Sequence, residues 1–267
     1  MTATPVTSEP ARGDAALRGS KSGPVAIVAA LPEELGALRG RLGQVETRRV
    51  GAVRVLTGRL GERPVILAAT GDGAARAARN AATILDRLGA TRLLIVGIAG
   101  GLSPGLHSGD LLVARRVVDL GDSAPLPQPD STWADQALAA GGTAALLISS
   151  PTILVTAQQK AATYASLPGG SVAAVDLETA ALAREAGVRG IPYLVLRAVS
   201  DPAEESLPMD FERLRNREGG VSRPRVLLHA LAQPSLMGSL LMLRNRLKGC
   251  AEALARMIPA VVREDAS

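Results

Sequence analysis

The sequence predicts an α/β fold in which three layers, α/β/α, are built around a central mixed, largely parallel sheet. Apolar runs typical of buried strands alternate with stretches that favour helix, and no internal repeat is visible. Glycine-rich loops follow several of these runs, where predicted strands end. Hydrophobic residues make up 47% of the 267 residues, which is enough for a large core. Since the chain has one Trp, two Tyr and one Phe, that core must be aliphatic.

The first part of the chain opens with an apolar strand and a proline. Val25–Leu31 is uninterrupted, which indicates burial on both faces. Pro32 suits the first position of a helix, and this helix is expected to end near Leu42. The next predicted elements are strands at Val53–Leu60 and Pro64–Thr70, and a helix at Ala74–Leu88 that Gly89 ends.

The second part continues the alternation of strands and helices. Gly121–Gly142 is rich in Pro, Asp, Gly and Ser and predicts an irregular lid or crossing segment. A short helix is expected at Asp210–Arg215 within a polar loop. The other predicted elements are strands at Arg92–Ile98, Leu111–Val118, Ala144–Ile148 and Tyr193–Val199, and helices at Thr156–Leu167 and Leu177–Ala186, the latter ended by Gly187.

Composition divides the chain into three parts. Residues 1–22 predict a disordered tail, residues 23–232 the catalytic α/β domain, and residues 233–267 an amphipathic helical extension. In Pro234–Val262, apolar residues recur at three- and four-residue steps, with a break or fraying expected near Pro259. This helix is expected to pack on the domain or on a second subunit, with a homodimer favoured. A peripheral membrane contact is the alternative.

Charge and composition exclude several classes of protein. The net charge of +5 comes mainly from arginines spread along the chain, and no aromatic and basic stripe indicates nucleic-acid binding. Cys250 is the single cysteine, and the two histidines lack paired ligand spacing, so neither a disulfide nor a metal site is expected. Because no segment resembles a secretory signal or a membrane span, a cytoplasmic location is expected.

Two carboxylates are predicted to approach one another near the end of the sheet. Glu178 stands where a helix begins, and Asp201 follows the last predicted strand. In open α/β sheets, ligands bind outside the carboxyl ends of the strands. Glu33 and Glu34 follow the first strand; they either complement a helix N-terminus or project over the same edge.

Two glycine-rich loops each allow a functional and a structural interpretation. Thr70–Gly73 lies between a strand and a helix, so it is either an anion-binding nest of backbone amides or a tight turn. Gly100 and Gly101 end another strand, where they either let a ligand approach the backbone or serve packing alone.

Four segments of the chain form a pattern with a fixed order and spacing, from about residue 24 to 205. They are Ala26–Leu35, Ala99–Leu102 with Gly109 and Asp110, Val175–Ala181, and Leu196–Asp201. Together these segments resemble the purine nucleoside phosphorylase and uridine phosphorylase superfamily, and they are most similar to its 5′-methylthioadenosine/S-adenosylhomocysteine nucleosidase branch.

The resemblance implies an enzyme with a division of labour among the acidic residues. Asp201 would act as general acid at the purine N7, Glu178 would hold the ribose hydroxyls with Leu177 against the sugar, and Glu34 would activate the attacking water. Such an acid and base suit N-glycosidic cleavage through an oxocarbenium-like state. The resemblance also implies that residues near the base or a bound anion are Gly71, Gly73, Gly100, Gly101 and Ser200.

Three questions about the function stay open: the nucleophile, the substrate and whether the protein is catalytic. Water is favoured as nucleophile because acids follow the first strand, whereas Arg76 or Arg197 would hold phosphate in a phosphorylase; no cofactor beyond phosphate is implied. The tail resembles the hopanoid-associated branch, which implies a lipid-linked adenosine as an alternative substrate. A non-catalytic nucleoside-binding protein is the third reading, since Ile98 replaces a small polar residue and no aromatic residue lies near Leu154.

Overall fold

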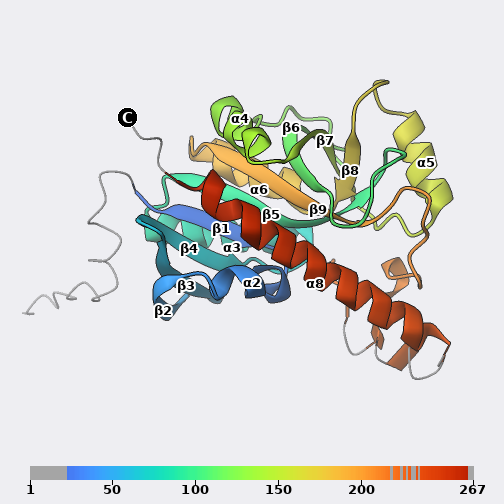
Figure 1. The fold of residues 1–267 in the computed structure, drawn as a ribbon, viewed down its shortest axis with the longest axis horizontal. Coiled ribbons are helices and arrows are strands. Elements are labelled where there is room, and N and C mark those ends of the chain that lie inside the picture. The colour runs from blue at the N-terminus through green and yellow to red at the C-terminus, as the bar shows by residue number, and fades with distance from the viewer. Residues whose placement is uncertain are drawn as a thin grey trace, which may run out of the picture.

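The computed structural model describes residues 23–216, 219–222, 225–226, 228–229, 233 and 235–263. In this part of the chain a nine-stranded mixed sheet lies between two layers of helices (Figure 1), which confirms the predicted α/β/α fold. The tail predicted for residues 1–22 lies outside the described residues.

The sheet closes on itself at one end. Strand β9 pairs with β5 in parallel and with β6 antiparallel, so that β5, β8, β7, β6 and β9 form a ring. In spatial order the strands are β2 (Gly43–Val50), β3 (Val53–Leu60), β4 (Arg63–Ala69), β1 (Val25–Ala29), β5 (Arg92–Gly101), β8 (Ala173–Asp176), β7 (Thr143–Ser149), β6 (Leu111–Asp119) and β9 (Tyr193–Asp201).

Helices cover both faces of the sheet, and each face has its own aliphatic core. Helices α3 and α6 pack on one face, while α4, α2 and the second half of α8 pack on the other (Figure 1). The described helices are η1 (Pro32–Leu35), α2 (Gly36–Arg39), α3 (Ala74–Leu88), α4 (Ser131–Ala139), α5 (Ala157–Ala165), α6 (Thr179–Val188), η2 (Glu212–Leu214) and α8 (Leu236–Val261), η1 and η2 being 3-10 turns.

Local sequence signals placed several elements correctly. Helix α3 has the predicted bounds, and Gly89 ends it in the left-handed conformation, with φ of 61°. Thr156 caps α5 as expected, because its hydroxyl accepts a hydrogen bond from the Gln159 amide at 3.1 Å. These positions depend on short-range chemistry that the sequence displays directly.

Other predictions were wrong where packing decides the structure. The helix expected after Pro32 is a 3-10 turn followed by one α-helical turn that ends at Arg39. Strand β2 was missed because it is mostly exposed and lacks an apolar run, and β8 because it is only four residues long. The helix predicted at Asp210–Arg215 is the three-residue turn η2.

The segment Gly121–Gly142 is not irregular throughout, because it contains α4. The Asp130 side chain caps this helix by accepting a hydrogen bond from the Trp133 amide at 2.8 Å. Trp133 is buried, and its indole Nε1 donates to the Val261 carbonyl at 2.7 Å. Helix α6 also differs from the prediction, since it continues through Gly187 to Val188.

Helix α8 has two unlike halves. From Cys250 onward it is largely buried in the core, and Pro259 lies inside its last turns without breaking it. Its first half leaves Met237, Leu241 and Met242 exposed. The second half of α8 therefore shares a core with the sheet, and the domain boundary at residue 233 stays a prediction. Among the described helices, none is long and apolar enough to cross a membrane.

Candidate active site

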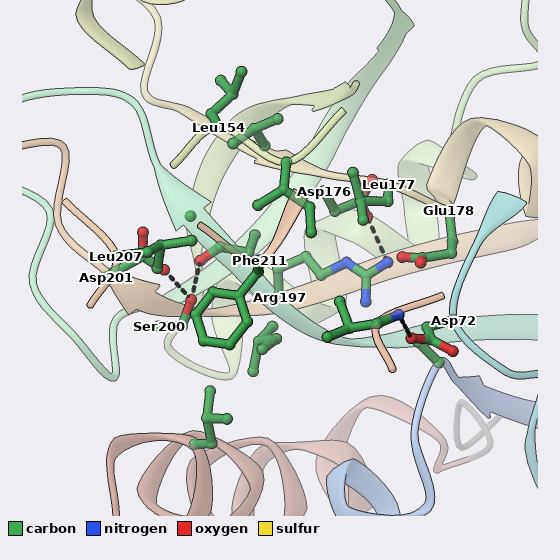
Figure 2. A pocket seen from close by; sticks show the side chains of 18 of the residues that line it. Asp72, Leu154, Asp176, Leu177, Glu178, Arg197, Ser200, Asp201, Leu207 and Phe211 are labelled. Atoms are coloured by element: carbon green, nitrogen blue, oxygen red, sulfur yellow. Dashed lines mark hydrogen bonds and ion pairs between the residues drawn. The ribbon is translucent and has the colours of Figure 1, made fainter. Parts of the chain in front are cut away.

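A cavity of about 320 Å³ lies at the edge of the sheet where β1, β5, β8 and β9 end (Figure 2). Most of its polar side chains come from these strands and the segments just after them, while Asp72 follows β4 and Lys160 belongs to α5. Further walls come from the segments after β7 and β9 and from α8, which contributes Leu243 and Leu247. The cavity thus brings together segments that are far apart in the sequence.

Glu34 is held at this edge by backbone amides of two different segments. Its carboxylate accepts hydrogen bonds from the Leu31 amide at 2.7 Å and from the Ile98 amide at 3.1 Å. Burial raises the pKa of this carboxyl above its ordinary value, although the nearby Arg197 guanidinium acts in the opposite direction. A buried carboxylate with a raised pKa and a fixed position is suited to accept a proton.

Gly97 makes room for this arrangement, and sequence analysis did not single it out. A Cβ at Gly97 would lie 2.7 Å from Glu34 Oε1 and would clash with the Arg197 guanidinium. Its φ of 152° is also one that other residues rarely adopt. Because Gly97 has no side chain, the Glu34 carboxylate and the Arg197 guanidinium can both lie close to the backbone of β5.

Arg197 is buried and already paired. Its Nη2 donates to Asp176 Oδ2 at 2.5 Å and to Thr179 Oγ1 at 2.8 Å. Asp176 in turn accepts from Ser149 Oγ at 2.8 Å. Sequence analysis considered Arg197 for phosphate but not Asp176 as its partner, because the register of β8 and β9 is not visible in the sequence.

Glu178 occupies the N-cap position of α6 and reaches the Thr70–Gly73 loop. Its Oε1 accepts a hydrogen bond from the Gly73 amide at 2.8 Å. The amide that could have bound an external anion therefore binds a carboxylate of the protein. Burial, followed by the neighbouring charge of Asp176, raises the pKa of Glu178 to about 7.

Asp201 lies at the opposite end of the polar region, and both of its carboxylate oxygens have a partner. Oδ1 accepts a hydrogen bond from Ser200 Oγ, and Oδ2 accepts one from Lys160 Nζ. Ser200 Oγ also lies 3.2 Å from the Ala99 carbonyl. A Cβ at Gly100 would come within 3.3 Å of Asp201 Oδ2, so this glycine leaves space beside the carboxylate.

An aromatic residue is present in the cavity, but it comes from a segment far from Leu154 in the sequence. Phe211 lines the cavity from the segment after β9 (Figure 2). The neighbouring Glu212 accepts a hydrogen bond from the Ile153 amide at 2.7 Å, which fastens this segment beside Leu154. The aromatic ring could not be located from the sequence because this contact joins distant segments.

The residues predicted for the site divide into two groups. Those that line the cavity are Glu34, Leu177, Glu178, Arg197, Ser200, Asp201 and Gly100. Gly71, Gly73, Gly101 and Arg76 are described but are not among its lining residues. In the described part of the chain, no group of three or more His, Cys, Asp or Glu side chains could hold a metal ion.

Comparisons with known proteins agree on one family. The model of the phosphorylase superfamily matches residues 24–231. The 5′-methylthioadenosine/S-adenosylhomocysteine nucleosidase of Mycobacterium bovis is 29% identical over 249 residues, covering 78% of this chain and 96% of the relative. That of Listeria innocua is 26% identical over 212 residues, covering 70% and 90%.

Solved structures of such nucleosidases share the fold. The enzyme from Neisseria meningitidis in complex with methylthio-immucillin-A has a TM-score of 0.70 at 24% identity, covering 90% of this chain and 98% of that one. The enzyme from Streptococcus pyogenes in complex with 5-methylthiotubericidin has a TM-score of 0.70 at 22% identity, covering 91% and 97%.

Proposed function

The chain belongs to the phosphorylase superfamily, and from this premise we propose that it hydrolyses the N-glycosidic bond of a 5′-substituted adenine nucleoside. The observation that carries the proposal is that Glu34, Glu178 and Asp201 line one cavity, although they come from three separate segments. The names of the relatives support the same reaction, since they are nucleosidases of 5′-methylthioadenosine and S-adenosylhomocysteine.

In the proposed reaction, Asp201 and Glu34 act on opposite sides of the ribose carbon C1′. Asp201 gives a proton to N7 of the base while the bond from C1′ to N9 breaks and its electron pair passes to the base. Glu34 takes a proton from the water whose oxygen bonds to C1′. The products are free adenine and the 5′-substituted ribose, and solvent returns the proton from Glu34 to Asp201.

Glu178 is proposed to hold the ribose hydroxyls, with Leu177 against the sugar. A carboxylate accepts hydrogen bonds from two hydroxyls, and Glu178 lines the same cavity as the other two acids. Gly100 and Ser200 are proposed to lie beside the base, next to Asp201. These assignments rest on the resemblance and on the shared cavity.

Charge favours water over phosphate as the nucleophile. The charge of Arg197 is already compensated by Asp176 within the protein, and the carboxyl groups of Glu34 and Glu178 line the same cavity. A phosphate entering here would be repelled by these carboxylates. The alternative of phosphorolysis depends on Arg76, which is not among the lining residues of the cavity.

The apolar wall is proposed to receive the 5′ substituent. Leu207, Phe211, Leu243 and Leu247 supply aliphatic and aromatic surface to the cavity. A methylthio group and a longer lipid-like group both match this chemistry, so adenosylhopane-type nucleosides are the alternative substrates. A homodimer and a peripheral membrane contact through α8 stay predictions.

The proposal is tested by measuring adenine release from a panel of nucleosides, with and without phosphate. The panel contains adenosine, 5′-methylthioadenosine, S-adenosylhomocysteine and an adenosine with a long alkyl group at the 5′ position. Hydrolysis predicts phosphate-independent release and free pentose. Release that requires phosphate and yields a pentose 1-phosphate would establish phosphorolysis, and binding without release would establish a non-catalytic protein.

Binding to liposomes tests the membrane contact separately. The full-length protein is compared with a variant in which the exposed Met237, Leu241 and Met242 are replaced by Ser. Selective binding of the full-length protein would support the contact. Equal and negligible binding of both proteins would refute it.

A further inference from the structure

Lys160 is a fully buried lysine in a chain that otherwise uses arginine for almost all of its positive charge. It belongs to α5, and its side chain points into the protein beside the cavity. Burial of an ammonium group is unfavourable unless the charge is paired and its hydrogen bonds are made. A lysine at this position therefore requires specific partners.

The partners of Lys160 account for all three N–H donors of its ammonium group. Nζ donates to Asp201 Oδ2, to the Pro202 carbonyl at 2.8 Å and to the Glu205 carbonyl at 2.8 Å. With these donors occupied, Lys160 has no N–H left for a substrate. Its effect on a reaction must pass through Asp201 or through the segment that follows it.

The segment after β9 has further anchors that do not involve Lys160. The Leu207 amide donates to the Val155 carbonyl at 2.8 Å, and Ser206 Oγ accepts from the Ala157 amide at 3.1 Å. Arg246 of α8 pairs with the Glu205 carboxylate at 2.6 Å. Because these contacts hold the segment without Lys160, we expect the loss of Lys160 to act chiefly through the Asp201 carboxylate.

We propose that Lys160 is a positioning residue for Asp201: together with Ser200 it fixes the plane of the carboxyl group so that the oxygen site that carries the transferable proton faces N7 of the base. A carboxylate offers about four lone-pair sites, and two are occupied by Ser200 and Lys160. The ammonium also offsets the negative charge that Asp201 carries after its proton has passed to the base. This inference rests on the proposed function.

The inference is tested with Lys160→Met, which keeps the length of the side chain but removes the charge and the donors. Adenine release is measured in single-turnover and steady-state experiments on the nucleoside that the wild-type protein cleaves best. We expect kcat to fall by about 10²-fold, since small misplacement of a reacting group has this effect. KM should change by less than about threefold, because substrate binding is retained.

A double-mutant cycle separates positioning of Asp201 from a general structural role. In the Asp201→Asn background, Lys160→Met should lower the rate by less than about threefold, because the group on which Lys160 acts is already lost. An equal loss of rate in both backgrounds would overturn the inference, as would an unchanged kcat in Lys160→Met. Lys248→Met, at an exposed position of α8, is the matched control.

Folding of each variant is checked by circular dichroism and thermal unfolding. If Lys160→Met does not fold, Lys160→Gln takes its place in the cycle, since the amide keeps donors without charge. The activity of the wild-type protein distinguishes failure of this inference from failure of the proposed function. If it releases adenine and the cycle is additive, this inference alone fails; if it releases no base from any nucleoside, the proposed function fails.

Discussion

The two sides of the cavity are built in different ways. The polar floor consists of Glu34, Asp176, Glu178, Arg197 and Asp201, which lie at strand ends and the segments next to them and are held by amides or by partners such as Lys160. The apolar wall consists of Leu207, Phe211, Leu243 and Leu247, which come from the segment after β9 and from α8. We infer that the floor carries the chemistry and that the wall selects the 5′ group.

The largest effect is expected for Asp201→Asn, which removes the proposed acid from the floor. The kcat for adenine release should fall by about 10² to 10⁴, the usual contribution of a positioned proton donor. Steady-state kinetics on 5′-methylthioadenosine checks this result. Asp135→Asn, an exposed change, is the control. An active Asp201→Asn protein with a normal kcat would contradict the assigned role.

Glu178→Gln should show how much the buried, ionised carboxylate of Glu178 lowers the free energy of unfolding. Because the pKa of Glu178 is about 7 when folded and 4.5 ordinarily, its contribution to stability is present below pH 4.5 and is lost as the pH rises through 7. The free energy of unfolding of the variant should therefore be about 3 kcal/mol higher than that of the wild type at pH 8. At pH 4 the two free energies of unfolding should be equal.

Denaturant unfolding at both pH values measures this difference. Glu252→Gln, at a more exposed position of α8, is the matched control. An equal stability difference at pH 4 and pH 8 would mean that the carboxyl group does not titrate as described.

Glu34→Gln should lower kcat by about 10²-fold, the lower end of the range for proton transfer, because an oxocarbenium-like carbon still reacts with unactivated water. The wild-type rate should fall as the pH drops below the raised pKa of Glu34, since only the ionised base accepts a proton. The variant should lack this acidic limb. A pH–rate profile of both proteins checks it, and identical profiles would refute the base role.

The smallest effect is expected in the wall, and it should differ in kind. Leu247→Ala should raise KM for a nucleoside with a long alkyl 5′ group about tenfold, as expected for lost apolar contact. It should leave kcat and the KM for adenosine unchanged. Leu241→Ala, at an exposed position of the same helix, is the matched control. A fall in kcat without a change in KM would break the distinction between floor and wall.

The sequence predicted those parts of the fold that depend on local signals. Apolar runs identified most strands, and Gly89 and Thr156 marked helix ends through their own chemistry. The acids at the strand ends were found because a fixed motif order accompanies them. Strand β2 gave no signal, since its residues are mostly exposed and polar, and α4 was hidden by the turn-forming residues before it.

The partners of the site residues could not be predicted because they come from distant segments. Lys160 lies in a stretch of α5 whose polar sequence is typical of an exposed helix, and only the tertiary fold brings it to Asp201. Its rarity in an arginine-rich chain was a usable signal, since arginine would serve at an ordinary exposed position. Gly97 was likewise hidden within the apolar run of β5.

The two halves of helix α8 are fixed in different ways. Its 26 residues span about 39 Å, and the half from Cys250 onward is buried in the core, with the Trp133 indole bonded to the Val261 carbonyl. The first half carries Leu243 and Leu247 to the cavity and is tied to the segment after β9 by the ion pair between Arg246 and Glu205. Because the acids stand on other elements, we expect a change in the packing of α8 to alter the space for the 5′ group while the acids stay in place.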